Sequence, residues 1–128
     1  MKIAIIGAGN IGGATAIGFL RGGAADADRI RVSARHEKSL RKFSRLGMRT
    51  FLDNVEAMEG ADIIFYAVKP WQMEEVVRQT AVHIDPGHQL VVSIAPGIKP
   101  DKLVGWFTRP DGRTPQIAYA IPNTAIEI

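Results

Sequence analysis

The chain has 128 residues, of which 46% are hydrophobic and 23% charged, and it contains no cysteine. These values are typical of one globular domain and exclude disulfide and thiol chemistry. No apolar run approaches the roughly 20 residues that a membrane-spanning helix needs, and Met1 leads directly into a predicted strand, which leaves no room for a signal peptide. We therefore expect a cytoplasmic protein in a reducing compartment, without a membrane partner.

The formal net charge is +3, and the basic residues cluster between Arg29 and Arg49. Two interpretations are open: a surface that binds nucleic acid, or a solvated helix face beside a ligand that carries phosphate. The second interpretation needs fewer assumptions, so we expect no nucleic-acid partner.

The most informative stretch is at the start, where the sequence reads MKIAIIGAGNIGGA. Gly7, Gly9 and Gly12 follow an apolar strand at the spacing G-x-G-x-x-G, and a stretch with helical spacing begins at Asn10. This context is typical of a dinucleotide-binding turn, in which Gly7 allows the tight turn, Gly9 lets the backbone approach a pyrophosphate, and Gly12 lets the helix pack closely on the strand. A glycine-rich turn without a ligand is the alternative.

Apolar patterning and turn residues predict six strands that alternate with helices. The strands are expected at 2–6, 29–34, 50–51, 62–68, 89–94 and 116–121, and the helices at 10–21, 37–46, 54–58, 71–80 and 101–107. The alternation predicts a Rossmann-type α/β fold, a doubly wound parallel sheet in the order 3-2-1-4-5-6 with helices on both faces.

Side chains within three of these helices have predicted positions. The expected set comprises Ile11, Ala14, Thr15, Gly18 and Phe19 on one side of the first helix, Leu40, Phe43 and Leu46 facing inward from the second, and Asp53 as the cap of the third. Ligands of such sheets bind beyond the carboxyl ends of the strands, which nominates the loops at 7–13, 33–36, 68–71 and 93–97.

The end of the second strand indicates which nicotinamide cofactor is bound. An NAD-binding domain usually carries an acidic residue there, but this chain reads Ser33-Ala34-Arg35-His36. A hydroxyl and a guanidinium suit a 2′-phosphate, so Ser33 and Arg35 predict that NADPH is preferred over NADH. The alternative is a surface arginine beside a serine that caps a helix. The three histidines lack metal-ligand spacing, so we expect no metal site.

Several stretches together resemble one family, and the resemblance runs from end to end of the chain. They are IAIIGAGNIGGA at 3–14, SAR at 33–35, Asp53-Asn54, ADIIFYAVKP at 61–70, VVSIAPGI at 91–98 and IPNTAIEI at 121–128. In this order they resemble the N-terminal half of the pyrroline-5-carboxylate reductases. Pro96 departs from the alanine that is common in that family, and Ile121 from the methionine.

The resemblance implies an oxidoreductase of proline biosynthesis. The implied reaction is hydride transfer from NAD(P)H to the C=N carbon of 1-pyrroline-5-carboxylate, a small imine, which gives L-proline. It also implies a dinucleotide-binding domain at 1–121, and at 122–128 the start of a junction to a C-terminal helical domain. That further domain would complete the substrate site and form a homodimer or higher homo-oligomer, so we expect the isolated chain to be poorly active.

The resemblance also implies cofactor-binding positions along the whole chain. They are Gly7, Ala8, Gly9, Asn10, Ile11 and Gly12 at the pyrophosphate, Ser33 and Arg35 at the 2′-phosphate, Asn54 on the adenosine side, Ala67, Val68, Lys69 and Pro70 near the ribose and nicotinamide, and Ser93, Ala95 and Gly97 beside the nicotinamide. No catalytic residue is assigned, although Asn123 and Thr124 are implied near the substrate. Lys69 and Asn54 also fit solvated positions at helix starts.

Two other functions remain open at this point. The first is another NADP-dependent oxidoreductase, of the hydroxyacid-dehydrogenase type, which would share the glycine turn but lack the later motifs. The second is a non-catalytic NADP-sensing module.

Overall fold

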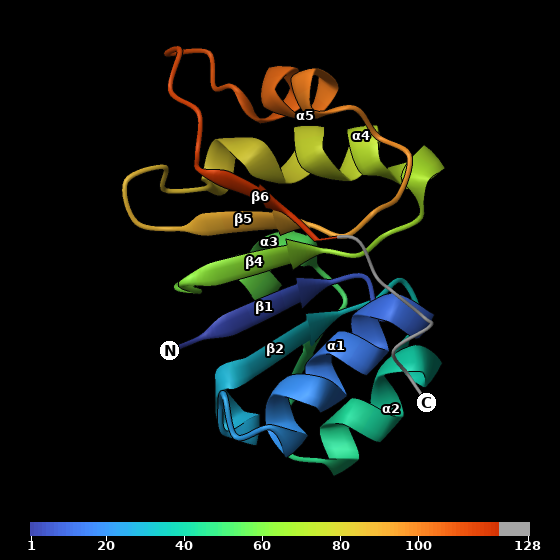
Figure 1. Ribbon diagram of the computed structural model, residues 1–128. Coiled ribbons are helices and arrows are strands. Elements are labelled where there is room, and N and C mark those ends of the chain that lie inside the picture. Colours follow the sequence, from blue (N-terminus) through green and yellow to red (C-terminus); the bar gives the residue numbers. More distant parts are fainter. Residues whose placement is uncertain (121–128) are drawn as a thin grey trace.

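The computed structural model describes residues 1–120, and a parallel six-stranded sheet lies at the centre of this part of the chain. The strands are β1 (Ile3–Ile6), β2 (Ile30–Ser33), β3 (Arg49–Phe51), β4 (Ile63–Tyr66), β5 (Leu90–Ser93) and β6 (Ile117–Tyr119). Their spatial order, β3-β2-β1-β4-β5-β6, confirms the predicted Rossmann-type topology (Figure 1). β1 is central, since Ile3 pairs in register with Ile30 on one side and with Ile63 on the other.

Helices cover both faces of this sheet, as predicted. They are α1 (Asn10–Arg21), α2 (Glu37–Arg45), α3 (Asn54–Met58), α4 (Pro70–Thr80) and α5 (Pro100–Phe107). α1 and α2 cover one face, and α3, α4 and α5 cover the other (Figure 1). Two 3-10 turns, η1 (Ala27–Arg29) and η2 (Ala81–His83), were not predicted.

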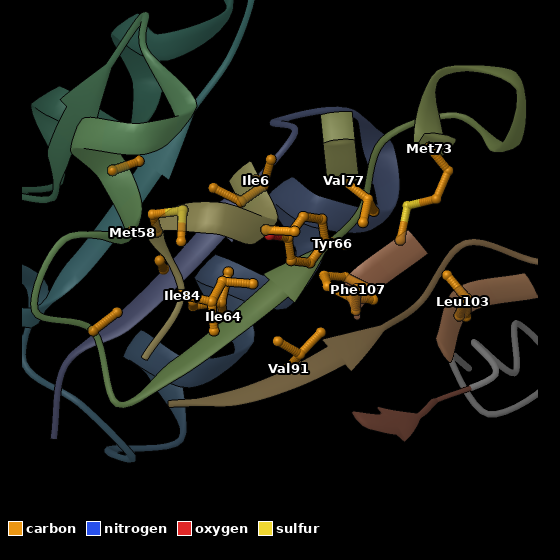
Figure 2. Close-up of a cluster of buried hydrophobic side chains, with 14 residues drawn as sticks. Ile6, Met58, Ile64, Tyr66, Met73, Val77, Ile84, Val91, Leu103 and Phe107 are labelled. Atoms are coloured by element: carbon orange, nitrogen blue, oxygen red, sulfur yellow. The ribbon is translucent and has the colours of Figure 1, made fainter. Parts of the chain in front are cut away.

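The larger hydrophobic cluster lies between the sheet and α3, α4 and α5. Alternate residues of the central strands supply its floor, because successive side chains of a strand point to opposite faces. The rings of Tyr66 and Phe107 meet edge to face, with centroids 5.1 Å apart (Figure 2). The buried Tyr66 hydroxyl forms a 2.7 Å hydrogen bond with the Thr80 hydroxyl, and burial raises the pKa of this phenol well above its usual value.

The smaller cluster joins β1 and β2 to α1 and α2, and here three of the predicted positions were wrong. Ile11 and Ala14 are exposed, as is Gly18, whereas Thr15 and Phe19 are half-buried. The residues that α1 buries are instead Gly12, Gly13 and Ala16. Near its start the helix lies so close to its neighbours that Gly12 and Gly13 leave no room for a larger side chain, whereas further along Phe19 packs on Phe65. A search for large apolar residues does not find the glycine part of this face.

The ends of two helices give one correction and one confirmation. Leu46 is 45% exposed, because it follows the last residue of α2, whereas Leu40 and Phe43 are buried as predicted. Asp53 does cap α3: its carboxylate accepts a 2.8 Å hydrogen bond from the Val55 N–H. Local capping chemistry was therefore more predictable than the position at which the second helix ends.

Within residues 1–120, none of the helices has the length and apolar character needed to cross a membrane. The predicted positions Asn123 and Thr124, and the junction at 122–128, lie outside the described residues.

Candidate functional site

The site is built on the turn between β1 and α1. Gly7 has a φ of +102°, a conformation that side chains disfavour, and a Cβ there would lie 2.9 Å from Cγ1 of Val68. A Cβ on Gly12 would overlap the carbonyl oxygen of Gly7 and would lie 3.1 Å from the Cβ of Ala67. The close packing expected of Gly12 is therefore present, and it holds the start of α1 against the ends of β1 and β4.

The N-terminus of α1 is open toward one side of this turn. Gly9 is the N-cap, no side chain caps the helix, and its first turn carries no acidic residue. A Cβ built on Gly9 would meet no atom within 4 Å, so the backbone there borders open space. Uncapped N–H groups and the positive end of the helix dipole make this turn complementary to an anion.

A cavity of about 400 Å³ lies beside this turn, at the carboxyl edge of the sheet. It is lined by the turn residues Gly7, Ala8, Gly9, Asn10 and Ile11, by Ala34, Arg35, His36 and Ser39, by Ala67, Val68, Lys69, Pro70 and Gln72, and by Ile94 and Pro96. Two cationic side chains, those of Arg35 and Lys69, line this first cavity and no carboxylate does. The charge of the lining thus favours an anionic ligand.

A second cavity, of about 350 Å³, adjoins the first. The two share the lining residues Gly7, Ala34, Arg35, Val68 and Gln72. The second cavity is further lined by Leu52, Asn54, Glu75, Val76 and Gln79. Arg35 is exposed and forms no hydrogen bond or ion pair with any other described residue, so its guanidinium is available to a ligand at the boundary between the two cavities.

A chain of hydrogen bonds runs from β2 to α4 along the second cavity. The Ser33 hydroxyl donates to Oδ1 of Asn54 at 2.7 Å, and Nδ2 of Asn54 donates to Oε1 of Gln79 at 3.2 Å. Ser33 itself is completely buried and lines neither cavity. Its hydroxyl therefore fixes the orientation of the Asn54 amide, which does line the second cavity.

The structure brings eleven of the sixteen predicted cofactor positions to these two cavities. The five that line neither are Gly12, Ser33, Ser93, Ala95 and Gly97. After β5 it is Ile94 and Pro96 that line the first cavity, which fits the alternation of side chains along an extended segment.

Sequence reasoning missed Gln72, Gln79 and Glu75, which line the second cavity from α4. The available signal was helical spacing. Gln72, Glu75 and Gln79 are three and four residues apart, so they share one face of the helix that follows β4.

Residues 2–97 match the model of a protein family described as NADP oxidoreductase, coenzyme F420-dependent. The match covers most of the chain, including the glycine turn and the loops after β2, β4 and β5. The chain belongs to this family.

The curated relatives of the chain include several pyrroline-5-carboxylate reductases. The protein from Pseudomonas aeruginosa is 35% identical over 124 residues, which are 96% of this chain and 43% of that protein. Pyrroline-5-carboxylate reductase 3 from Macaca fascicularis is 33% identical over 97 residues, which are 76% of this chain and 35% of that protein. The resemblance inferred from the sequence is confirmed, and the chain spans less than half the length of both relatives.

Solved structures show the same fold. A pyrroline-5-carboxylate reductase from Coxiella burnetii superimposes with a TM-score of 0.78 at 21% identity, over 98% of this chain and 61% of that one. The Plasmodium falciparum pyrroline carboxylate reductase, solved with NADP bound, gives a TM-score of 0.77 at 22% identity, over 97% of this chain and 43% of that one.

Proposed function

We propose that this chain supplies the cofactor-binding half of an NADPH-dependent pyrroline-5-carboxylate reductase, which reduces 1-pyrroline-5-carboxylate to L-proline. The observation that carries the proposal is the pair of adjoining cavities at the carboxyl edge of the sheet, which begin at an uncapped helix N-terminus. Both are lined by Arg35, which has no hydrogen bond or ion pair within residues 1–120. The names of the curated relatives supply the substrate.

The residues present fit a dinucleotide. The turn from Gly7 to Ile11 would hold the pyrophosphate, because its backbone is open and the helix end is positive. Arg35 would pair with the 2′-phosphate in a charge-assisted hydrogen bond, the basis for a preference for NADPH over NADH. Leu52 and Val76 offer apolar surface in the second cavity, beside the Asn54 amide, which suits the adenosine end.

The chain's own contribution to the reaction is binding, orientation and exclusion of water. When bound, the reduced nicotinamide supplies the hydride for the C=N carbon of the imine. The segment from Ala67 to Pro70 lies at the end of β4 and would set the depth of the ribose and nicotinamide in the first cavity. Ile94 and Pro96 add an apolar wall, which would keep water from the reacting face.

The proposal also covers the domain organisation, the substrate site, the oligomeric state and the cellular location. We assign residues 1–121 to the dinucleotide-binding domain and 122–128 to a junction with a helical domain that completes the substrate site and forms a homo-oligomer. Asn123 and Thr124 would lie near the substrate. We also propose a cytoplasmic location, which the absence of cysteine from the sequence favours.

The test is NADPH oxidation with 1-pyrroline-5-carboxylate, run on the 128-residue chain and on the product of any reading frame that continues past Ile128. We expect the 128-residue chain to bind NADPH weakly to moderately and to reduce the imine poorly, and a longer product to form proline. Robust proline formation by the 128-residue chain would contradict the proposed division of the site. Absence of NADPH binding would contradict the cofactor assignment.

A further inference from the structure

The excess positive charge of this protein is concentrated on α2. Lys38, Arg41, Lys42 and Arg45 are exposed along this helix, and Glu37 is its one acidic residue. The formal charge of the helix is therefore +3, which equals the formal net charge of the whole chain. The other residues carry equal numbers of positive and negative charges, so α2 accounts for the net excess of positive charge.

This basic surface is continuous with the proposed cofactor site. The four cationic side chains of α2 line a shallow concavity together with Ala8 and Ser39. Ala8 and Ser39 also line the first cavity, beside the glycine turn. α1 and α2 lie on the same face of the sheet (Figure 1), and the shared lining residues make the basic concavity adjoin the first cavity.

The charges of α2 are not neutralised locally. Among residues 1–120 the ion pairs are Arg78–Glu74, His88–Asp62 and Arg109–Asp111, and none of them involves α2. A surface that only kept the protein in solution would be served by interspersed charges of both signs. A single-sign surface beside an anion site has a different physical consequence, because it raises the local concentration of anionic ligands.

We infer that the α2 cations steer the polyanionic NADPH to the glycine turn, and that they act on the rate of association without contacting the bound cofactor. The inference rests on the proposed function, because it requires a ligand that carries several phosphate charges. Charges outside a binding interface change kon and its salt dependence, whereas groups in contact with the ligand change koff. The two roles can therefore be separated kinetically.

The experiment is stopped-flow binding of NADPH to the 128-residue chain, followed by quenching of its two tryptophans. The test variant is Arg41→Gln/Arg45→Gln. The control variant, Lys102→Gln/Arg113→Gln, removes the same number of charges from exposed positions on α5 and the loop that follows it. Arg41→Lys/Arg45→Lys keeps the charge and removes only the guanidinium groups.

At an ionic strength of about 0.02 M we expect kon of the test variant to fall roughly three- to tenfold, with koff unchanged within about twofold. The difference should disappear at about 0.5 M, because salt screens exposed charges. The control and the Arg→Lys variant should match the unsubstituted chain. A second test variant, Lys38→Gln/Lys42→Gln, removes two other charges of the same surface and should show the same decrease in kon. It replaces the first test variant if that variant fails to fold.

Three results would overturn the inference. The first is a kon that does not depend on the α2 charges at low salt. The second is a loss of affinity that resides in koff, which would mean direct contact. The third is an unsubstituted chain that does not bind NADPH, which would also overturn the proposed function, whereas the first two leave that function intact.

Discussion

Replacing Gly12 with alanine tests how closely α1 must approach the sheet to form the glycine turn. The added Cβ would overlap the carbonyl oxygen of Gly7 and lie 3.1 Å from the Cβ of Ala67. One of these atoms belongs to the backbone and the other to the shortest side chain, so neither can rotate away. Relief requires α1 to move away from β1 and β4, which would open the site itself.

The cost follows from two opposing effects. Overpacking a well-packed position costs about 1–3 kcal/mol, and a backbone clash belongs at the upper end of that range or beyond it. Alanine in place of glycine within a helix recovers about 1 kcal/mol. We therefore expect a net loss of about 2 kcal/mol, which lowers Tm by roughly 7 °C for a domain of this size.

The assay is thermal and urea unfolding of Gly12→Ala beside a matched control, Gly18→Ala. Gly18 lies in the same helix, but a Cβ there would meet no atom within 4 Å. The control should therefore be stabilised by up to about 1 kcal/mol through helix propensity alone. If both variants unfold at the same temperature, the close packing of α1 does not have the role that we give it.

Three further changes have expected outcomes. Arg35→Asp should lower the affinity for NADPH relative to NADH by roughly ten- to hundredfold, because a charge-assisted hydrogen bond is typically worth about 1.5–3 kcal/mol; parallel titrations with the two cofactors measure it. Ser33→Ala should cost about 1–2 kcal/mol of stability and weaken NADPH binding roughly fivefold, because the Asn54 amide loses the donor that orients it; unfolding and binding titrations check both. Tyr66→Phe should cost about 1 kcal/mol at neutral pH, because Thr80 keeps its hydrogen bond to the backbone. Because burial raises the pKa of the folded-state phenol above its usual 10.0, the native protein loses stability as the pH rises past about 10, and Tyr66→Phe should lack that loss in alkaline unfolding curves.

For each of these three substitutions, one result would contradict the prediction. An unchanged ratio of NADPH to NADH affinity in Arg35→Asp would remove the 2′-phosphate assignment. Full NADPH affinity in Ser33→Ala would mean that Asn54 does not need its hydrogen bond to Ser33. The same alkaline loss of stability in Tyr66→Phe as in the unsubstituted chain would assign that loss to other groups.

The strand order and most element boundaries could be predicted because local signals agreed with one another. The apolar run before Gly7, Pro70 at the start of α4 and Asp53 at the start of α3 each mark an element end by local chemistry. The 3-10 turns η1 and η2 were missed because such short elements have no periodic signal of their own.

The site was harder to predict where the burial of a residue depends on how distant segments of the chain pack together. Ser33 ends β2 at the edge where ligands bind, but its side chain turns inward to Asn54, and no local pattern distinguishes the two directions. Ile11 is exposed at the start of α1, where it lines the first cavity, while its neighbour Gly12 packs against Gly7 and Ala67. Gln72 lines both cavities because α4 starts beside them, and that position follows from the whole fold.

The central claim is that the two adjoining cavities hold the dinucleotide, and an NMR titration of the isotope-labelled chain with NADPH tests it most directly. We predict shifts of the backbone amides at 7–12, 34–36 and 67–70 and of the Asn54 side-chain amide, with little change in the loop at 108–115. Shifts confined to other surfaces, or no saturable shift at these positions, would contradict the account.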